Sequence, residues 1–241
     1  MDAGRRWALE TFGQYGPLIR EQIAKLVLDE HESSLDAQEA SGHRSRSVYG
    51  EYWRGILEKF EEFFGNLPGA AMTRPGGAPY KIPVVNGVAL YPWRYAKSRE
   101  TELANTPFAT SSARTEAANL RPTGVQEALL SLDLPDPQLT EEEQLLVDGF
   151  TAYTGDPLVS SSRMVLVAIS SSVNGLFSVQ WGEVQLTADG YVEWIGDPES
   201  LLELQPTLPV STSPTRTFTS GEPPKRFPDT DVDGEASTDE R

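Results

Sequence analysis

Residues 80–99 contain an Asn-Gly pair between two apolar runs, YKIPVV and VALYPW. Asn86 and Gly87 are residue types that tolerate the positive φ angles of a two-residue hairpin turn. Because successive side chains of a strand point to opposite faces, this turn places one set of residues on one face of the hairpin. The set is Tyr80, Ile82, Val84, Ala89, Tyr91 and Trp93. The pattern predicts a β-hairpin over residues 80–95, with this aromatic face as the one that packs on the core.

Two prolines limit how this hairpin can be hydrogen-bonded. Pro83 lies in the first expected strand and Pro92 in the second. A proline has no N–H group, so a strand that contains one cannot be hydrogen-bonded along both of its edges. The hairpin is therefore expected at an edge of its sheet, or leaving the sheet near Pro92.

An aromatic stripe predicts the helix that covers this sheet. Between residues 49 and 64, apolar side chains recur at the three- and four-residue spacing of one helix face. They are Tyr49, Tyr52, Trp53, Ile56, Leu57, Phe60, Phe63 and Phe64. The sequence predicts an N-terminal helical region over 1–66 that packs this stripe against the sheet. The alternative is that the stripe forms a partner or dimer interface.

A second strand-rich region spans residues 163–195. Residues 164–169 form a continuous apolar run of strand length, and a longer strand pattern over 176–187 ends at an Ala-Asp-Gly turn. We therefore expect an α+β fold in which the helical layer packs on an antiparallel sheet made of hairpin 80–95 and meander 163–195. Residues 67–204 are expected to form this core, as one globular unit with 1–66. Trp181 and Val184 fall on opposite faces, which predicts either a bulge at Gly182 or an inward-pointing Glu183.

The remaining stretch, residues 205–241, is acidic and rich in Pro, Ser and Thr. It has too few apolar residues to offset the entropy of ordering, so we predict a disordered tail. The chain has no cysteine, which excludes disulfides and thiolate chemistry. It also has no apolar run of signal-peptide or membrane-spanning length, so a cytoplasmic protein with no membrane partner is expected. The excess of Arg over Lys suggests a bacterial source.

Charge is unevenly distributed along this chain of net charge −16. Residues 67–121 carry seven basic and three acidic side chains, whereas residues 122–196 carry one basic and eleven acidic ones. An acidic chain is a poor general nucleic-acid binder, so any nucleic-acid contact would have to use the basic segment. That segment predicts an anion-recognition surface formed with Trp93 by Arg94, Lys97, Arg99, Arg114 and Arg121. The alternative is that these cations pair with the acidic segment downstream.

Side chains that could carry out catalysis are sparse. The two histidines lack the spacing of a metal site, and no nucleotide-binding glycine motif is present. Asp156 precedes the expected central strand, and Glu183 and Gln185 lie on the next one. Acids on adjacent strands can hold a divalent cation for phosphodiester hydrolysis. This arrangement distantly resembles the Asp…Glu-x-Lys pattern of restriction-endonuclease-like nucleases, with Gln185 in place of the lysine and no second acid beside the first.

Two classes of function follow from these features. The first is a non-enzymatic cytoplasmic interaction protein, such as an accessory, regulatory or immunity-type partner. It would act through its acidic surface and its basic anion-recognition residues, with a protein partner and without a metal or cofactor. The second is a hydrolase of nucleic acids or nucleotides that uses Asp156, Glu183 and a divalent metal. The first class needs less from the sequence, so it is the leading hypothesis.

Overall fold

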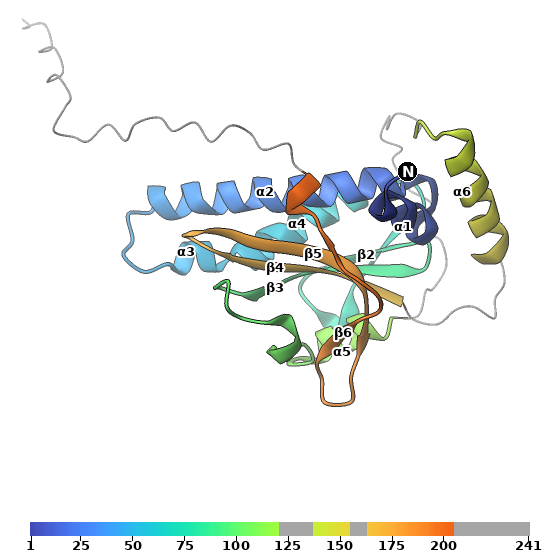
Figure 1. Ribbon diagram of the computed structural model, residues 1–241. Coiled ribbons are helices and arrows are strands. Elements are labelled where there is room, and N and C mark those ends of the chain that lie inside the picture. Colours follow the sequence, from blue (N-terminus) through green and yellow to red (C-terminus); the bar gives the residue numbers. More distant parts are fainter. Residues whose placement is uncertain (121–136, 155–162, 205–241) are drawn as a thin grey trace, which may run out of the picture. The chain divides into compact units, whose positions relative to one another are not determined.

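The computed structural model describes residues 1–120, 137–154 and 163–204, and for residues 150–154 and 204 it describes the backbone alone (Figure 1). The helices are α1 (Ala3–Phe12), α2 (Gly16–Ala40), α3 (Ser47–Gly50), α4 (Tyr52–Phe64), α5 (Ser112–Ala118) and α6 (Glu141–Thr154). The strands are β1 (Ala70–Thr73), β2 (Ile82–Val85), β3 (Val88–Ala96), β4 (Arg163–Ser172), β5 (Gly175–Leu186), β6 (Val192–Trp194) and β7 (Glu199–Ser200). The predicted disordered tail lies outside the described residues.

The strands form one mixed sheet in the order β1-β2-β3-β4-β5-β6, and β7 also pairs with β5. The expected hairpin and the expected meander are both antiparallel, as predicted. They meet at β3 and β4, however, and these two strands run parallel. Parallel neighbours need a long crossover connection, which residues 97–162 supply. A connection of that length allows either strand direction, so the sequence pattern could not decide between them.

The hairpin turn is where the sequence predicted it. Val85 pairs with Val88, and both turn residues have positive φ, 49° at Asn86 and 77° at Gly87. The hairpin is not at the edge of the sheet, because β1 pairs with β2 and β4 pairs with β3. In a two-residue hairpin the closing pair exchanges its backbone hydrogen bonds, so Pro83, two residues before Val85, presents its nitrogen to β3. The missing donor explains why β2 pairs with β3 at only two positions, Val84–Ala89 and Val85–Val88.

Both faces of the sheet are buried. One face carries Val88, Leu90 and Val167 and packs against α1, α2 and α4. The other face carries Tyr91, Trp93 and Leu166 and packs on the segment that contains Phe108 and α5. Figure 1 shows α2 and α4 on one side of the sheet and α5 on the other. The expected aromatic face is therefore buried, but the N-terminal helices cover the opposite face. Because β3 carries apolar residues on both of its faces, the sequence pattern does not indicate which face the N-terminal helices cover.

The aromatic stripe packs largely as predicted, but Phe63 is only partly buried and Trp53 is exposed. Tyr52, Ile56, Phe60 and Phe64 are fully buried against the sheet, whereas 38% of Trp53 is exposed. Residues 52, 56, 60 and 64 follow one another at intervals of four, so they lie on one side of α4. Trp53 is one residue beyond this series, about 100° around the helix, and its ring centroid lies 6.5 Å from that of Tyr80.

Glu183 points inward, which was one of the two alternatives for β5. The pairing of β4 with β5 runs without a shift through Leu166–Gly182 and Val165–Glu183, so no bulge interrupts that pairing at Gly182. Glu183 accepts two hydrogen bonds from Arg163, at 2.9 and 2.7 Å, and only 16% of its side chain is exposed. Both faces of the sheet are buried, so Trp181 packs in the core on the helix-covered face and Val184 packs in the core on the opposite face.

An ion pair joins α6 to α1 and gives folding a specific pH dependence. Glu143 is 4% exposed and accepts hydrogen bonds from Arg5 and from the Thr140 backbone N–H. The Arg5 hydrogen bond is the main reason why the pKa of Glu143 falls from the ordinary 4.5 to about 2. A lowered carboxyl pKa stabilises the fold fully above pH 4.5, and this contribution is lost as the pH falls toward 2.

We therefore expect Glu143→Gln to lower the Tm at neutral pH and to lower it much less as the pH approaches 2, where the carboxylate of the wild type becomes protonated. Glu142→Gln is the control, because its carboxylate is exposed and 3.8 Å from Arg6. Thermal melts at a series of pH values measure both variants. An equal Tm difference between Glu143→Gln and wild type at every pH would contradict this assignment.

Candidate anion-binding site

Among the described strands, none pairs with one edge of β3 over most of its length. β2 pairs only with Val88 and Ala89, while β4 pairs with β3 along the other edge as far as Ala96. Beyond Ala89, therefore, no described strand covers the β2-facing edge of β3. Pro92 lies opposite Val167 of β4 within this stretch. A proline is tolerated inside a strand when its nitrogen faces an unpaired edge, so the sequence of β3 suits this position.

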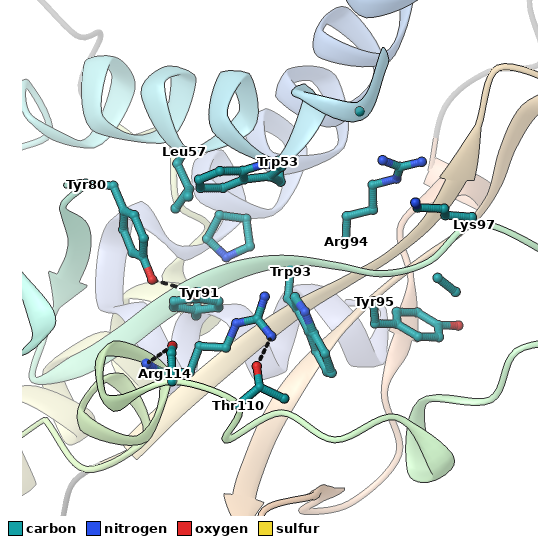
Figure 2. A pocket seen from close by; sticks show the side chains of 14 residues that line it. Trp53, Leu57, Tyr80, Tyr91, Trp93, Arg94, Tyr95, Lys97, Thr110 and Arg114 are labelled. Carbon is teal, nitrogen blue, oxygen red and sulfur yellow. Dashed lines mark hydrogen bonds between the residues drawn. The ribbon is translucent and has the colours of Figure 1, made fainter. Parts of the chain in front are cut away.

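A cavity of about 470 Å³ lies along this unpaired edge (Figure 2). We call it the β3-edge cavity. Residues 91–96 of β3 and Lys97, which follows the strand, line it together with Gly50, Trp53, Leu57, Tyr80, Thr110, Ser111 and Arg114. Neighbouring residues of a strand point to opposite faces, so a cavity that contacts seven in a row follows the edge of the strand. Its volume is within the range of pockets that hold small molecules or side chains of a partner.

Arg94 enters this cavity from the helix-covered face of the sheet. Its Nε and Nη2 atoms donate to the Ser171 carbonyl oxygen at 3.1 and 2.8 Å, and its guanidinium lies 4.9 Å from the ring centroid of Tyr49. Burial lowers the pKa of the Arg94 guanidinium, because the cation is partly removed from water. These contacts hold the side chain in place but neutralise none of its charge.

Arg114 enters from the opposite face, on α5. Ser111 caps this helix by accepting from the Arg114 N–H at 3.4 Å. The preceding segment is fixed because the N–H groups of Phe108 and Ala109 both donate to the Gly190 carbonyl at 2.9 Å. The Arg114 guanidinium lies 5.4 Å from the ring centroid of Trp93 and donates to Thr110 Oγ1 at 3.0 Å. As with Arg94, its neighbours are an aromatic ring and a neutral oxygen.

Arg94 and Arg114 differ from the other partly or fully buried cations in the described part of the chain, because neither has a carboxylate partner there. Each of the other Lys and Arg residues that is at least partly buried there has a carboxylate within 4.0 Å; they are Arg5, Arg20, Lys59, Lys81 and Arg163. No such ion pair links Arg94 or Arg114 to a described carboxylate, and the lining of the cavity contains no Asp or Glu. Removing a cation from water without a counter-charge is costly, and an anion that enters the cavity would supply that charge.

The structure brings together part of the predicted basic surface. Arg94, Lys97, Arg114 and Trp93 all line the cavity. Trp93 is 5% exposed and faces the core, while Arg94 lies on the other face of β3. Arg99 is exposed and outside the cavity lining, and Arg121 lies outside the described residues. The alternative was that these cations pair with the acidic segment 122–196. Among the described residues, no ion pair links Arg94, Lys97, Arg99 or Arg114 to a carboxylate of that segment.

Several lining residues were not expected from the sequence. Trp53 was assigned to the buried stripe, and Tyr80 and Tyr91 were treated only as core residues. The hydroxyls of these two tyrosines lie 3.0 Å apart and close one end of the cavity. Burial raises the pKa of Tyr91, which keeps this hydroxyl neutral. The available signal for Trp53 was its place one residue beyond the four-residue series of the stripe.

The candidate catalytic residues do not form a site in the described parts of the chain. Glu183 is held by Arg163, and Gln185 is exposed, with its Nε2 donating to Glu193 at 3.2 Å. Asp156 lies outside the described residues. Within residues 1–120, 137–154 and 163–204, no cluster of three or more His, Asp or Glu side chains is arranged to hold a metal ion. His31 is buried beside Tyr49, with Nδ1 and the hydroxyl 2.7 Å apart, and burial lowers its pKa.

Comparison with protein-family models, with curated proteins and with solved structures finds no match to this chain. None of the helices that the structure describes combines the length and the apolar character that crossing a bilayer requires.

Proposed function

We propose that this protein is a non-enzymatic interaction protein that binds an anionic group of a partner protein in the β3-edge cavity. The observation that supports this proposal is the state of Arg94 and Arg114. Among the described Lys and Arg residues that are partly or fully buried, these two lack a carboxylate, and both line the same cavity. Guanidinium groups bind carboxylates and phosphates through paired, charge-assisted hydrogen bonds.

The chemistry around the two arginines favours a segment of a protein over a polyanion. Trp53, Trp93 and Tyr95 provide aromatic surface next to the cations, and aromatic residues and arginine are the residue types that contribute most to protein interfaces. The chain as a whole has a net charge of −16, which repels nucleic acids and other long polyanions. A short acidic segment can enter the cavity without bringing many negative charges close to the acidic surface.

The probe for this proposal is a short capped peptide of alternating valine and threonine with two adjacent glutamates at its centre. We expect fluorescence anisotropy to show binding that weakens as ionic strength rises. A matched peptide with glutamines in place of the glutamates should bind about tenfold more weakly, because the charge-assisted hydrogen bonds are lost. Equal affinity for the two peptides would overturn the proposal.

Arg114→Ala is the variant that places this binding in the cavity. It should weaken binding of the glutamate peptide by about tenfold and leave the Tm near that of wild type, because the Thr110 hydroxyl to which Arg114 donates is exposed and can bond to water instead. Arg74→Ala is the matched control, since Arg74 is exposed and does not line the cavity. If Arg74→Ala lost as much affinity as Arg114→Ala, the binding would reflect general charge and the site would be wrong.

A further inference from the structure

We infer that the partner segment binds as an extended β-strand that adds to the unpaired edge of β3. This inference rests on the proposed function and specifies how the acidic segment is held. Addition of a strand to an exposed sheet edge is a general mode of peptide recognition, in which backbone hydrogen bonds provide affinity and flanking pockets provide specificity. The segment belongs to a partner protein and presents two neighbouring acidic residues.

The backbone of β3 is oriented for this pairing. The closing pair of the hairpin, Val85 and Val88, exchanges hydrogen bonds, so the backbone groups of Val88 face β2. With a period of two, those of Leu90, Pro92 and Arg94 face the same edge. Leu90 lies opposite Pro83, which has no N–H to donate to it. The pairing of β2 with β3 ends before Pro92, so β2 does not hydrogen-bond to Pro92 or Arg94. The Pro92 C=O and the Arg94 N–H thus point toward the cavity, and no hydrogen bond outside the sheet ladders engages them in the described part of the chain. Beyond Arg94 the register of β3 against β4 shifts, between Arg94 and Ala96.

The walls of the cavity match the two faces of an added strand. Figure 2 shows Trp53 and Arg94 on one side of β3, and Trp93 and Arg114 on the other. Side chains of a strand paired with β3 would alternate between these two sides. A residue that reaches Arg94 and a residue that reaches Arg114 must therefore be neighbours in the partner sequence, or an odd number of positions apart. Because β3 shifts register against β4 between Arg94 and Ala96, the unpaired edge from Pro92 to Ala96 spans about three regular strand steps, or roughly 10 Å, which is room for three or four residues.

Charge complementarity selects an acidic strand as the occupant. An apolar strand would cover Arg94 and Arg114 and remove them further from water without a counter-charge, which is unfavourable. Two adjacent acidic side chains would place one carboxylate on each side of the edge. This gives each guanidinium the partner that it lacks among the described residues.

Backbone methylation of the probe peptide tests the strand mode separately from charge. In a strand, the N–H groups of alternate residues point to opposite edges, so only one alternate set can face β3. We compare two versions of the glutamate peptide, one methylated on the odd-numbered backbone nitrogens near its centre and the other on the even-numbered ones. Methylation removes the donor and blocks close approach while it leaves every charge in place.

The expected result is an asymmetry between these two peptides. One should lose at least about tenfold in affinity and the other should stay within about twofold of the unmethylated peptide. In addition, hydrogen exchange at the Arg94 backbone amide should slow when the unmethylated peptide saturates the protein. If both methylated peptides bind as well as the parent while the glutamine peptide does not, strand addition is wrong and the anion site stands. Equal losses for both methylated peptides would also contradict strand addition, because one edge cannot contact both sets.

Discussion

Replacing Trp181 with alanine is expected to lower the free energy of unfolding by about 4 kcal/mol, the largest effect of any single substitution considered for this fold. Trp181 is fully buried on β5. Its ring contacts Trp7 edge-to-face at a centroid distance of 4.9 Å and stacks on Phe12 at 5.8 Å. Its Nε1–H donates to Glu199 at 2.8 Å, and Glu199 in turn accepts from the buried Arg20. The substitution removes contacts with α1 and leaves Glu199 with one donor fewer.

Chemical denaturation measures this effect, and Trp53→Ala is the matched control. Trp53 is the same residue type but 38% exposed, so its loss should change the free energy of unfolding by less than about 1 kcal/mol. The packing described here would be wrong if Trp181→Ala cost no more than Trp53→Ala. The control also carries information on function, because Trp53 lines the cavity and its loss should weaken binding of the glutamate peptide.

Arg94→Ala is expected to lower both stability and binding. Its side chain satisfies the Ser171 carbonyl with two hydrogen bonds and lies over the Tyr49 ring, so its loss should cost about 2 kcal/mol of unfolding free energy. Arg94 is one of the two partly buried cations that have no carboxylate within 4.0 Å among the described residues, so binding of the glutamate peptide should fall by at least about tenfold.

Arg99→Ala is the control for Arg94→Ala, because Arg99 lies nearby in sequence but is exposed and does not line the cavity. It should leave both stability and peptide affinity close to wild type. The comparison with Arg114→Ala separates the two roles, since that variant should lose binding while keeping its Tm. Unchanged stability and unchanged affinity in Arg94→Ala would contradict the structural and the functional assignment together.

The parts of the fold that depend on neighbouring residues could be predicted from the sequence. The Asn86-Gly87 turn follows from the φ angles that two residues must adopt, and the burial of Phe60 and Phe64 follows from the spacing of one helix face. The pairing of β3 with β4 could not be predicted in the same way. The connection of residues 97–162 is long enough to allow either strand direction. In addition, β3 has apolar residues on both of its faces, so its pattern does not indicate which face the helices cover.

The candidate site was predictable only in part, for a similar reason. A local excess of basic residues indicated Arg94, Lys97 and Arg114, and the two prolines indicated that the hairpin could not be fully paired. The geometry arises from their combination: Pro83 ends the pairing of β2, and Pro92 suits an unpaired edge of β3. The positions of Arg94 and Arg114 on opposite sides of that edge depend on α5, which is brought there by contacts of Phe108 and Ala109 with the Gly190 turn. No pattern within either segment specifies that contact.

The most direct test of the anion site is an NMR titration of the tryptophan indole N–H resonances with the glutamate peptide. The chain contains five tryptophans, of which Trp53 and Trp93 line the β3-edge cavity and Trp7, Trp181 and Trp194 do not. We predict that the resonances of Trp53 and Trp93 shift as the peptide saturates the protein, while the other three stay in place. Peptide binding that shifts neither the Trp53 nor the Trp93 resonance, or that causes its largest shifts at Trp7, Trp181 or Trp194, would contradict an anion site in the β3-edge cavity.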